Sequence, residues 1–110
     1  MNPRAPQQPS LFELPQRPLS AVPKTPEQQA LAAALPRSLH MGAMTWSYPG
    51  WTGVVYAEQH SERELAGRGL TAYCQQPLLR AAELDRTYYE PLSAASYSQY
   101  AEQVPADFRF

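Results

Sequence analysis

The chain has 110 residues, with 9 Lys and Arg against 10 Asp and Glu and a formal net charge of -1 at pH 7. This balance leaves no basic excess to neutralise a run of phosphates, so nucleic acid is a poor candidate partner. The single cysteine excludes an intrachain disulfide and a thiolate zinc cluster.

No stretch approaches the ~20 consecutive apolar residues of a membrane span. Prolines and glutamines interrupt every apolar run near the N-terminus, which is not the pattern of a secretory signal. We therefore expect a cytoplasmic protein with no membrane contact.

The first expected segment is a Pro-rich disordered tail over residues 1–24. Seven of the twelve prolines lie between Pro3 and Pro26 without a repeat, and each removes a backbone donor and disfavours helix before it. The apolar residues Leu11, Phe12 and Leu14 of SLFELP could dock on a partner as a short motif, or they could pack nowhere.

A short leading helix is predicted over residues 25–36. Thr25 is a typical N-cap, Pro26 suits the first helical position, and Gln28 completes a capping box. Pro36 stops the helix.

Residues 37–110 alternate between strand and helix patterns. A buried strand is expected to begin near Leu39. A helix over 61–76 should be broken at Gly67 and Gly69, with Leu70, Tyr73 and Cys74 on its buried face.

A second strand is expected over 78–89. A third helix follows, capped by Ser93, with Tyr97, Tyr100, Ala101 and Val104 on one stripe. DFRF then begins a third strand, and this order predicts a parallel sheet in an α/β fold.

Several motifs in series carry a family resemblance. MGAMT and WSYPGW at the first strand, GLTAYCQQPLL, ELDRTYY on the second strand and VPADFRF on the third resemble the YecE-like family, also called domain of unknown function 72. The similarity runs from about Leu39 to Phe110, in the family's own order. It brings no established reaction.

This resemblance implies a (β/α) barrel of the TIM type, of which the chain supplies the N-terminal part. Full domains of the family are more than twice as long as the matched segment. Their third strand continues as an apolar run ending in lysine, whereas this sequence ends at Phe110. We expect an incomplete barrel with about two β-α units and the start of the third strand. Such a chain should be aggregation-prone, molten or dependent on a partner chain that completes the barrel.

The loop after the first strand is the first candidate site. Ligands of TIM-type barrels bind at the carboxyl ends of the strands. Aromatic faces in this loop could stack on a sugar, a base or another planar group, and hydroxyls could orient it. The alternative is that the rings only pack the loop. The predicted substrate-binding residues here are Trp46, Ser47, Tyr48 and Trp51.

The second candidate site is ELDR on the second strand. Glu83 and Asp85 share one side of a strand, about 7 Å apart, and could act as catalytic acid and base or hold a cation. They could equally pair with Arg80 or Arg86. Arg86 is also a possible anion ligand, and alternation favours Tyr89 over its neighbour as an inward ring.

No metal role is predicted for His40 or His60, because neither has a ligand-like neighbour at a fixed offset. The cofactor is unknown. Cys74 is interpreted as an inert buried thiol.

Two functions from different classes remain open. One is part of a barrel enzyme, such as a hydrolase or isomerase, that binds a small polar or nucleotide-like molecule and is inactive alone. The other is an interaction protein or gene remnant that acts through its Pro-rich tail.

Overall fold

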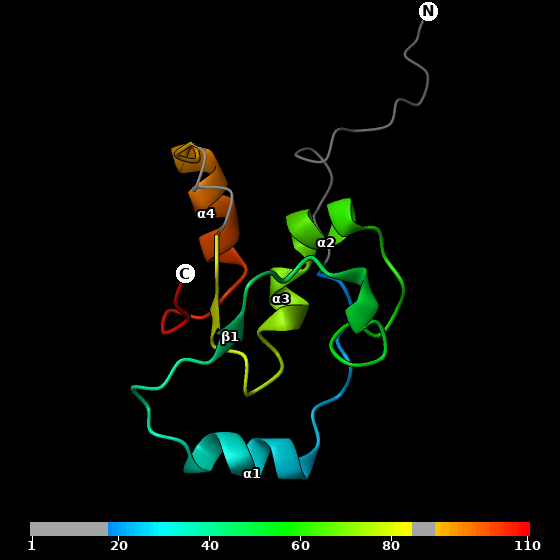
Figure 1. The fold of residues 1–110 in the computed structure, drawn as a ribbon, viewed down its shortest axis with the longest axis vertical. Coiled ribbons are helices and arrows are strands. Elements are labelled where there is room, and N and C mark those ends of the chain that lie inside the picture. The colour runs from blue at the N-terminus through cyan, green and yellow to red at the C-terminus, as the bar shows by residue number, and fades with distance from the viewer. Residues whose placement is uncertain (1–17, 85–89) are drawn as a thin grey trace, which may run out of the picture.

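The computed structural model describes residues 18–84 and 90–110, and Figure 1 shows how its short elements are arranged. In chain order these elements are α1 (Pro26–Ala34), β1 (Gly42–Ala43), the 3-10 turn η1 (Pro49–Trp51), α2 (Glu62–Arg68), α3 (Leu70–Tyr73), β2 (Ala81–Ala82) and α4 (Ala94–Glu102). Strand and helix therefore alternate from β1 onward. Among the described residues, no helix is long and apolar enough to cross a membrane.

Each of the predicted helix starts is confirmed by its cap. The side chains of Thr25 and Ser61 each accept a hydrogen bond from the backbone N–H three residues later, and the side-chain oxygens of Gln28 and Glu64 each accept one from the backbone N–H of the capping residue. Ser93 caps α4 by accepting from a backbone N–H of its first turn. These bonds satisfy N–H groups that have no partner inside a helix, so the caps fix where the helices begin.

The predicted break in the second helix is also confirmed, and it lies at Gly69 between α2 and α3. The Gly69 N–H donates to the Leu65 carbonyl oxygen at 2.8 Å. A Cβ atom on Gly69 would lie 2.5 Å from that same oxygen, so no larger residue fits without a shift of backbone. The glycine therefore lets the chain turn closely into α3.

The strands pair in parallel and in sequence order. Gly42 lies opposite Ala81, and Ala43 lies opposite Ala82. Beyond β2, Arg109 forms a parallel bridge with Ala81, and its carbonyl oxygen accepts from the Ala82 N–H at 3.0 Å. The three chain segments predicted as strands thus lie side by side, while a barrel beyond them stays a prediction.

The paired stretches are shorter than the predicted strands. Within the described residues, the strand predicted over 78–89 is assigned only at β2. The Tyr73 hydroxyl ties the two short strands together, since it accepts from the Ala43 N–H at 2.9 Å and donates to the Ala81 carbonyl oxygen at 2.8 Å.

The core lies between one side of this sheet and the helices that connect its strands. Its largest fully buried side chains come from the loop after β1 and from α2 and α3; they are Tyr56, Tyr73, Leu65 and Leu70. Ala82 supplies the sheet side, and Tyr100 is the buried residue of α4. Half-buried Cys74 packs at the border of this core, where burial raises the pKa of its thiol.

The stripe predicted on the last helix is buried only in part. Tyr100 is buried, but Tyr97 is 42% exposed, Ala101 is exposed and Val104 is half-buried. Tyr100 reaches the core, where its ring lies T-shaped to the Trp46 ring with centroids 5.2 Å apart, and Val104 packs against the border of the core. Spacing along the helix placed these residues on one stripe but could not say how much of that stripe another element covers.

The end of the predicted tail packs against the domain and is not free. Leu19 is buried, and Ala21 forms an antiparallel bridge with Tyr56. The backbone of Val22 donates to the Val55 carbonyl oxygen at 2.9 Å, which holds the segment along the loop. Residues 1–17, with the SLFELP motif, lie outside the described residues.

The buried tyrosines predict a loss of stability in alkali. Burial, and to a lesser extent the neighbouring Tyr73, raises the pKa of Tyr56 above its ordinary value of 10.0, and burial raises the pKa of Tyr73 as well. Above about pH 10 the unfolded chain therefore binds fewer protons than the folded one, so stability is intact below that pH and falls as pH rises. Circular dichroism and tyrosinate absorbance, followed together, should change in one transition. Ionisation of all seven tyrosines with unchanged circular dichroism would contradict this.

Candidate functional site

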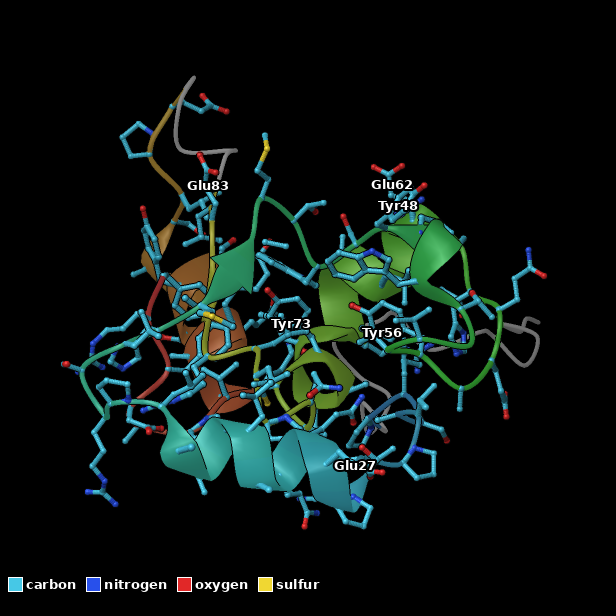
Figure 2. All side chains as sticks on the ribbon, turned by 60° about the horizontal axis from the view of Figure 1, so that its bottom comes forward. Glu27, Tyr48, Tyr56, Glu62, Tyr73 and Glu83 are labelled. Carbon is cyan, nitrogen blue, oxygen red and sulfur yellow. The ribbon has the colours of Figure 1, made fainter. Side chains whose placement is uncertain are left out.

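The carboxyl ends of β1 and β2 lie at the end of the molecule opposite α1. Figure 2 shows Glu83 and Tyr48 at this end and Glu27 of α1 at the other. Glu83 follows β2 directly, and Tyr48 lies in the loop after β1. Both residues therefore lie at the end of the sheet where the strands finish, and their role in a ligand site stays a prediction. The predicted site residues Asp85, Arg86 and Tyr89 lie outside the described residues.

Glu83 is exposed and extends the strand pairing through its backbone. Its N–H donates to the Ala43 carbonyl oxygen at 3.3 Å. Alternation along the strand puts its side chain on the opposite side from buried Ala82, away from the core. Within the described residues the Glu83 carboxylate forms no ion pair, and Arg80, one predicted partner, instead binds Asp107 at 2.8 Å.

Trp46 is a core residue in this structure. Only 6% of it is exposed, and its indole Nε1–H donates to the carbonyl oxygens of Leu65 at 3.1 Å and Ala66 at 3.3 Å. Its ring meets those of Tyr100 and Phe110 edge-on. The indole therefore joins the start of the loop to α2 and α4, which leaves little of its surface for a ligand.

Tyr48 and Trp51 form the accessible aromatic part of the loop. Tyr48 is 53% exposed and lies edge-on to the Trp51 ring at a centroid distance of 6.0 Å. Gly50 lies under the Tyr48 ring, where a Cβ atom would be 2.5 Å from the ring carbons. Half-buried Trp51 stacks on Tyr73 at 5.9 Å, so the pair rests on the core. The two rings present a phenol hydroxyl and aromatic edges to solvent.

Ser47 stabilises the turn that leads to these rings. Its N–H donates to the Thr45 hydroxyl oxygen at 3.1 Å, and the two hydroxyl oxygens are 3.0 Å apart. A hydroxyl already shared with a neighbour can still take one more partner. Ser47 is half-buried and is thus still able to contact a ligand.

Tyr56 is an aromatic residue of this loop that is not among the predicted binding residues. It is fully buried, and its hydroxyl donates to the Trp46 carbonyl oxygen, so the loop is closed by a bond between its two ends. An aromatic residue ten positions after Trp46 was the only signal for this closure. The loop geometry therefore rests on two buried tyrosines, Tyr56 and Tyr73.

The described residues offer an exposed carboxylate and a phenol at one end of a parallel sheet. Such groups can transfer a proton, accept hydrogen bonds and pack against a planar or sugar-like molecule. No group of three or more His, Cys, Asp or Glu side chains gathers within residues 18–84 and 90–110. His60 Nδ1 lies 3.8 Å from the Glu64 carboxylate.

Comparison with known proteins gives one match. The family model described as "Protein of unknown function DUF72" matches residues 40–110. No curated protein and no solved structure matches the chain. The match covers β1, β2, the loops that follow them and α4, and it leaves α1 outside.

Proposed function

This chain belongs to the DUF72 family of proteins of unknown function, and from this premise we propose that it forms the first part of a TIM-type (β/α) barrel with part of a ligand site. The site lies at the carboxyl ends of the strands and takes a small polar or nucleotide-like molecule. Residues 1–110 are inactive by themselves in this proposal, because further strands are needed to complete the barrel and the other wall of the site.

The open sheet supports this proposal. Within the described residues, β1 pairs with β2 and Arg109 bridges only Ala81, so the outer edges of both segments have no strand partner there. The sheet side that carries Gly42 and Glu83 is exposed, whereas Ala82 on the other side is buried. Further strands could pair with those edges and enclose the exposed side, as barrel closure requires.

The proposed chemistry rests on the exposure and position of the Glu83 carboxylate. Its carboxylate is exposed at a strand end and is unpaired among the described residues, and it faces the side that further strands would enclose. Enclosed in a completed site, Glu83 and Asp85 would serve as one acid and one base. Arg86 would bind an anionic part of the ligand.

The aromatic loop supplies the binding surface of this site. Tyr48 and Trp51 would contact the flat face of the ligand, and the Ser47 hydroxyl would form a hydrogen bond with it. Tyr89 is proposed as a further ligand contact. Trp46 would act by positioning the loop, because its indole is already committed to α2.

A reconstituted barrel tests the proposal. The isotope-labelled chain is co-expressed with the remaining barrel segment of a full-length DUF72 protein and titrated with sugars, nucleosides and small polar acids. We expect copurification of the two segments and amide shifts centred on Ser47, Tyr48 and Glu83. Glu83→Gln should weaken ligand binding about tenfold, the effect of losing one charge-assisted hydrogen bond.

Glu27→Gln is the matched control, since it removes a carboxylate at the opposite end of the molecule (Figure 2). It should leave ligand affinity within twofold of the wild type. An assembled barrel in which Glu83→Gln binds as tightly as the unmodified chain would overturn the proposed role of this carboxylate. Failure of the two co-expressed segments to assemble would overturn the proposal that the chain forms part of a barrel.

A further inference from the structure

A cleft of about 630 Å³ lies at the end of the molecule opposite the proposed ligand site. Its walls come from the second half of α1, from His40 before β1, from Pro77 and Arg80 before β2, and from Arg109. Figure 1 shows α1 lying across this end of the molecule. Because α1 lies outside the family match, the cleft combines family and non-family parts of the chain.

Positive charge gathers in this cleft although the whole chain carries a net charge of -1. Three guanidinium groups line it, from Arg37, Arg80 and Arg109, and the one carboxylate in the lining is that of Asp107. Counting these groups, three positive charges less one negative charge leave a surplus of two.

The three arginines of the cleft differ in how firmly hydrogen bonds and ion pairs fix their side chains. Arg80 is fixed, because it donates to the Asp107 carboxylate at 2.8 Å and to the Leu39 carbonyl oxygen at 3.3 Å. Arg109 reaches two backbone carbonyl oxygens only at the long distance of 3.4 Å. Arg37 is exposed and has no hydrogen bond or ion pair within the described part of the chain. The guanidinium groups of Arg37 and Arg109 thus keep N–H donors for a ligand.

We propose that this cleft binds a small phosphate monoester, with Arg37 and Arg109 as its main phosphate ligands and Arg80 as a fixed positive charge beside them. The surplus of two charges matches a phosphate dianion, and planar guanidinium forks pair with phosphate oxygens through two hydrogen bonds.

A separate, apolar wall of the cleft is available to the organic part of the ligand. Ala32, Leu35 and Pro77 form the apolar part of the lining, and the cleft falls within the usual volume range of small-molecule sites. A phosphate joined to a compact organic group would use both parts. A long polyanion fits less well, because Asp107 interrupts the positive surface and the rest of the chain carries excess negative charge.

Binding of inorganic phosphate and of phenyl phosphate to the full chain tests the proposal by isothermal titration calorimetry and amide shifts. Arg37→Gln and Arg109→Gln should each weaken binding about tenfold, as expected for one lost charge-assisted pair. Arg63→Gln is the control, because Arg63 lies exposed on α2 outside the cleft. It should change affinity by less than twofold.

Asp107→Asn tests the charge count in the opposite direction. Removal of the only carboxylate in the lining should strengthen phosphate binding several-fold, and weaker binding would contradict the proposal. Equal losses in Arg63→Gln and Arg37→Gln would also overturn it, since they would indicate only general attraction. Acetate binding as tightly as phosphate would reassign the cleft to carboxylates, and tighter binding of a single-stranded oligonucleotide would reassign it to nucleic acid. These outcomes are independent of the Glu83 site, which lies at the other end.

Discussion

Replacing Gly42 by alanine is expected to separate β1 from β2 and to lower the free energy of unfolding by about 3 kcal/mol, the upper range for an overpacked site. A Cβ atom on Gly42 would lie 1.9 Å from the Ala81 carbonyl oxygen and 3.0 Å from the Ala81 Cβ. Both obstacles belong to the partner strand, so the strands must move apart. Urea unfolding followed by circular dichroism measures the loss, which is large for a small domain.

Gly67→Ala is the matched control for this substitution. Gly67 lies inside α2, and a Cβ atom there would meet nothing within 4 Å. Alanine in the interior of a helix should stabilise the chain by ~0.5–1 kcal/mol relative to glycine. Equal effects of the same sign at Gly42 and Gly67 would show that the approach of Gly42 to Ala81 does not limit the packing of these strands.

Replacing Trp46 by alanine is the second substitution with a large expected effect. Loss of a buried tryptophan typically costs about 3–5 kcal/mol, since it leaves a cavity and removes apolar contacts. Here the ring contacts with Tyr100 and Phe110 and the hydrogen bonds to α2 would all disappear. We expect a lower urea midpoint together with loss of the near-ultraviolet circular dichroism of the packed ring.

Tyr48→Ala serves as the comparison within the same loop. Tyr48 is 53% exposed and contacts Trp51 at its edge, so its removal should lower the free energy of unfolding by less than about 1 kcal/mol. If Trp46→Ala is as mild as Tyr48→Ala, Trp46 is not part of the core. The pair thus separates the aromatic residue that holds the loop from the one that is available to a ligand.

The helices of this protein were largely predictable from sequence because their start signals are local. Thr25 with Gln28, and Ser61 with Glu64, form hydrogen bonds over three residues, which any neighbouring structure leaves unchanged. The break at Gly69 is local as well. The alternation of strands and helices followed from these boundaries and gave the order of pairing from β1 to Arg109.

Burial and proximity were decided only by the tertiary structure. The sequence treated Trp46 and Tyr48 as equivalent rim aromatics, whereas packing buried the first against α2 and left the second exposed. The packing of Leu19 on the domain had no signal among the prolines that surround it.

The sequence by itself determined where the helices begin and which end of the sheet carries Glu83, because both depend on hydrogen bonds and alternation among near neighbours. Only the tertiary structure brought Arg37, Arg80 and Arg109 into one cleft and placed the Tyr73 hydroxyl between β1 and β2. These groups are far apart along the chain, and contacts of that kind depend on how all the elements pack together.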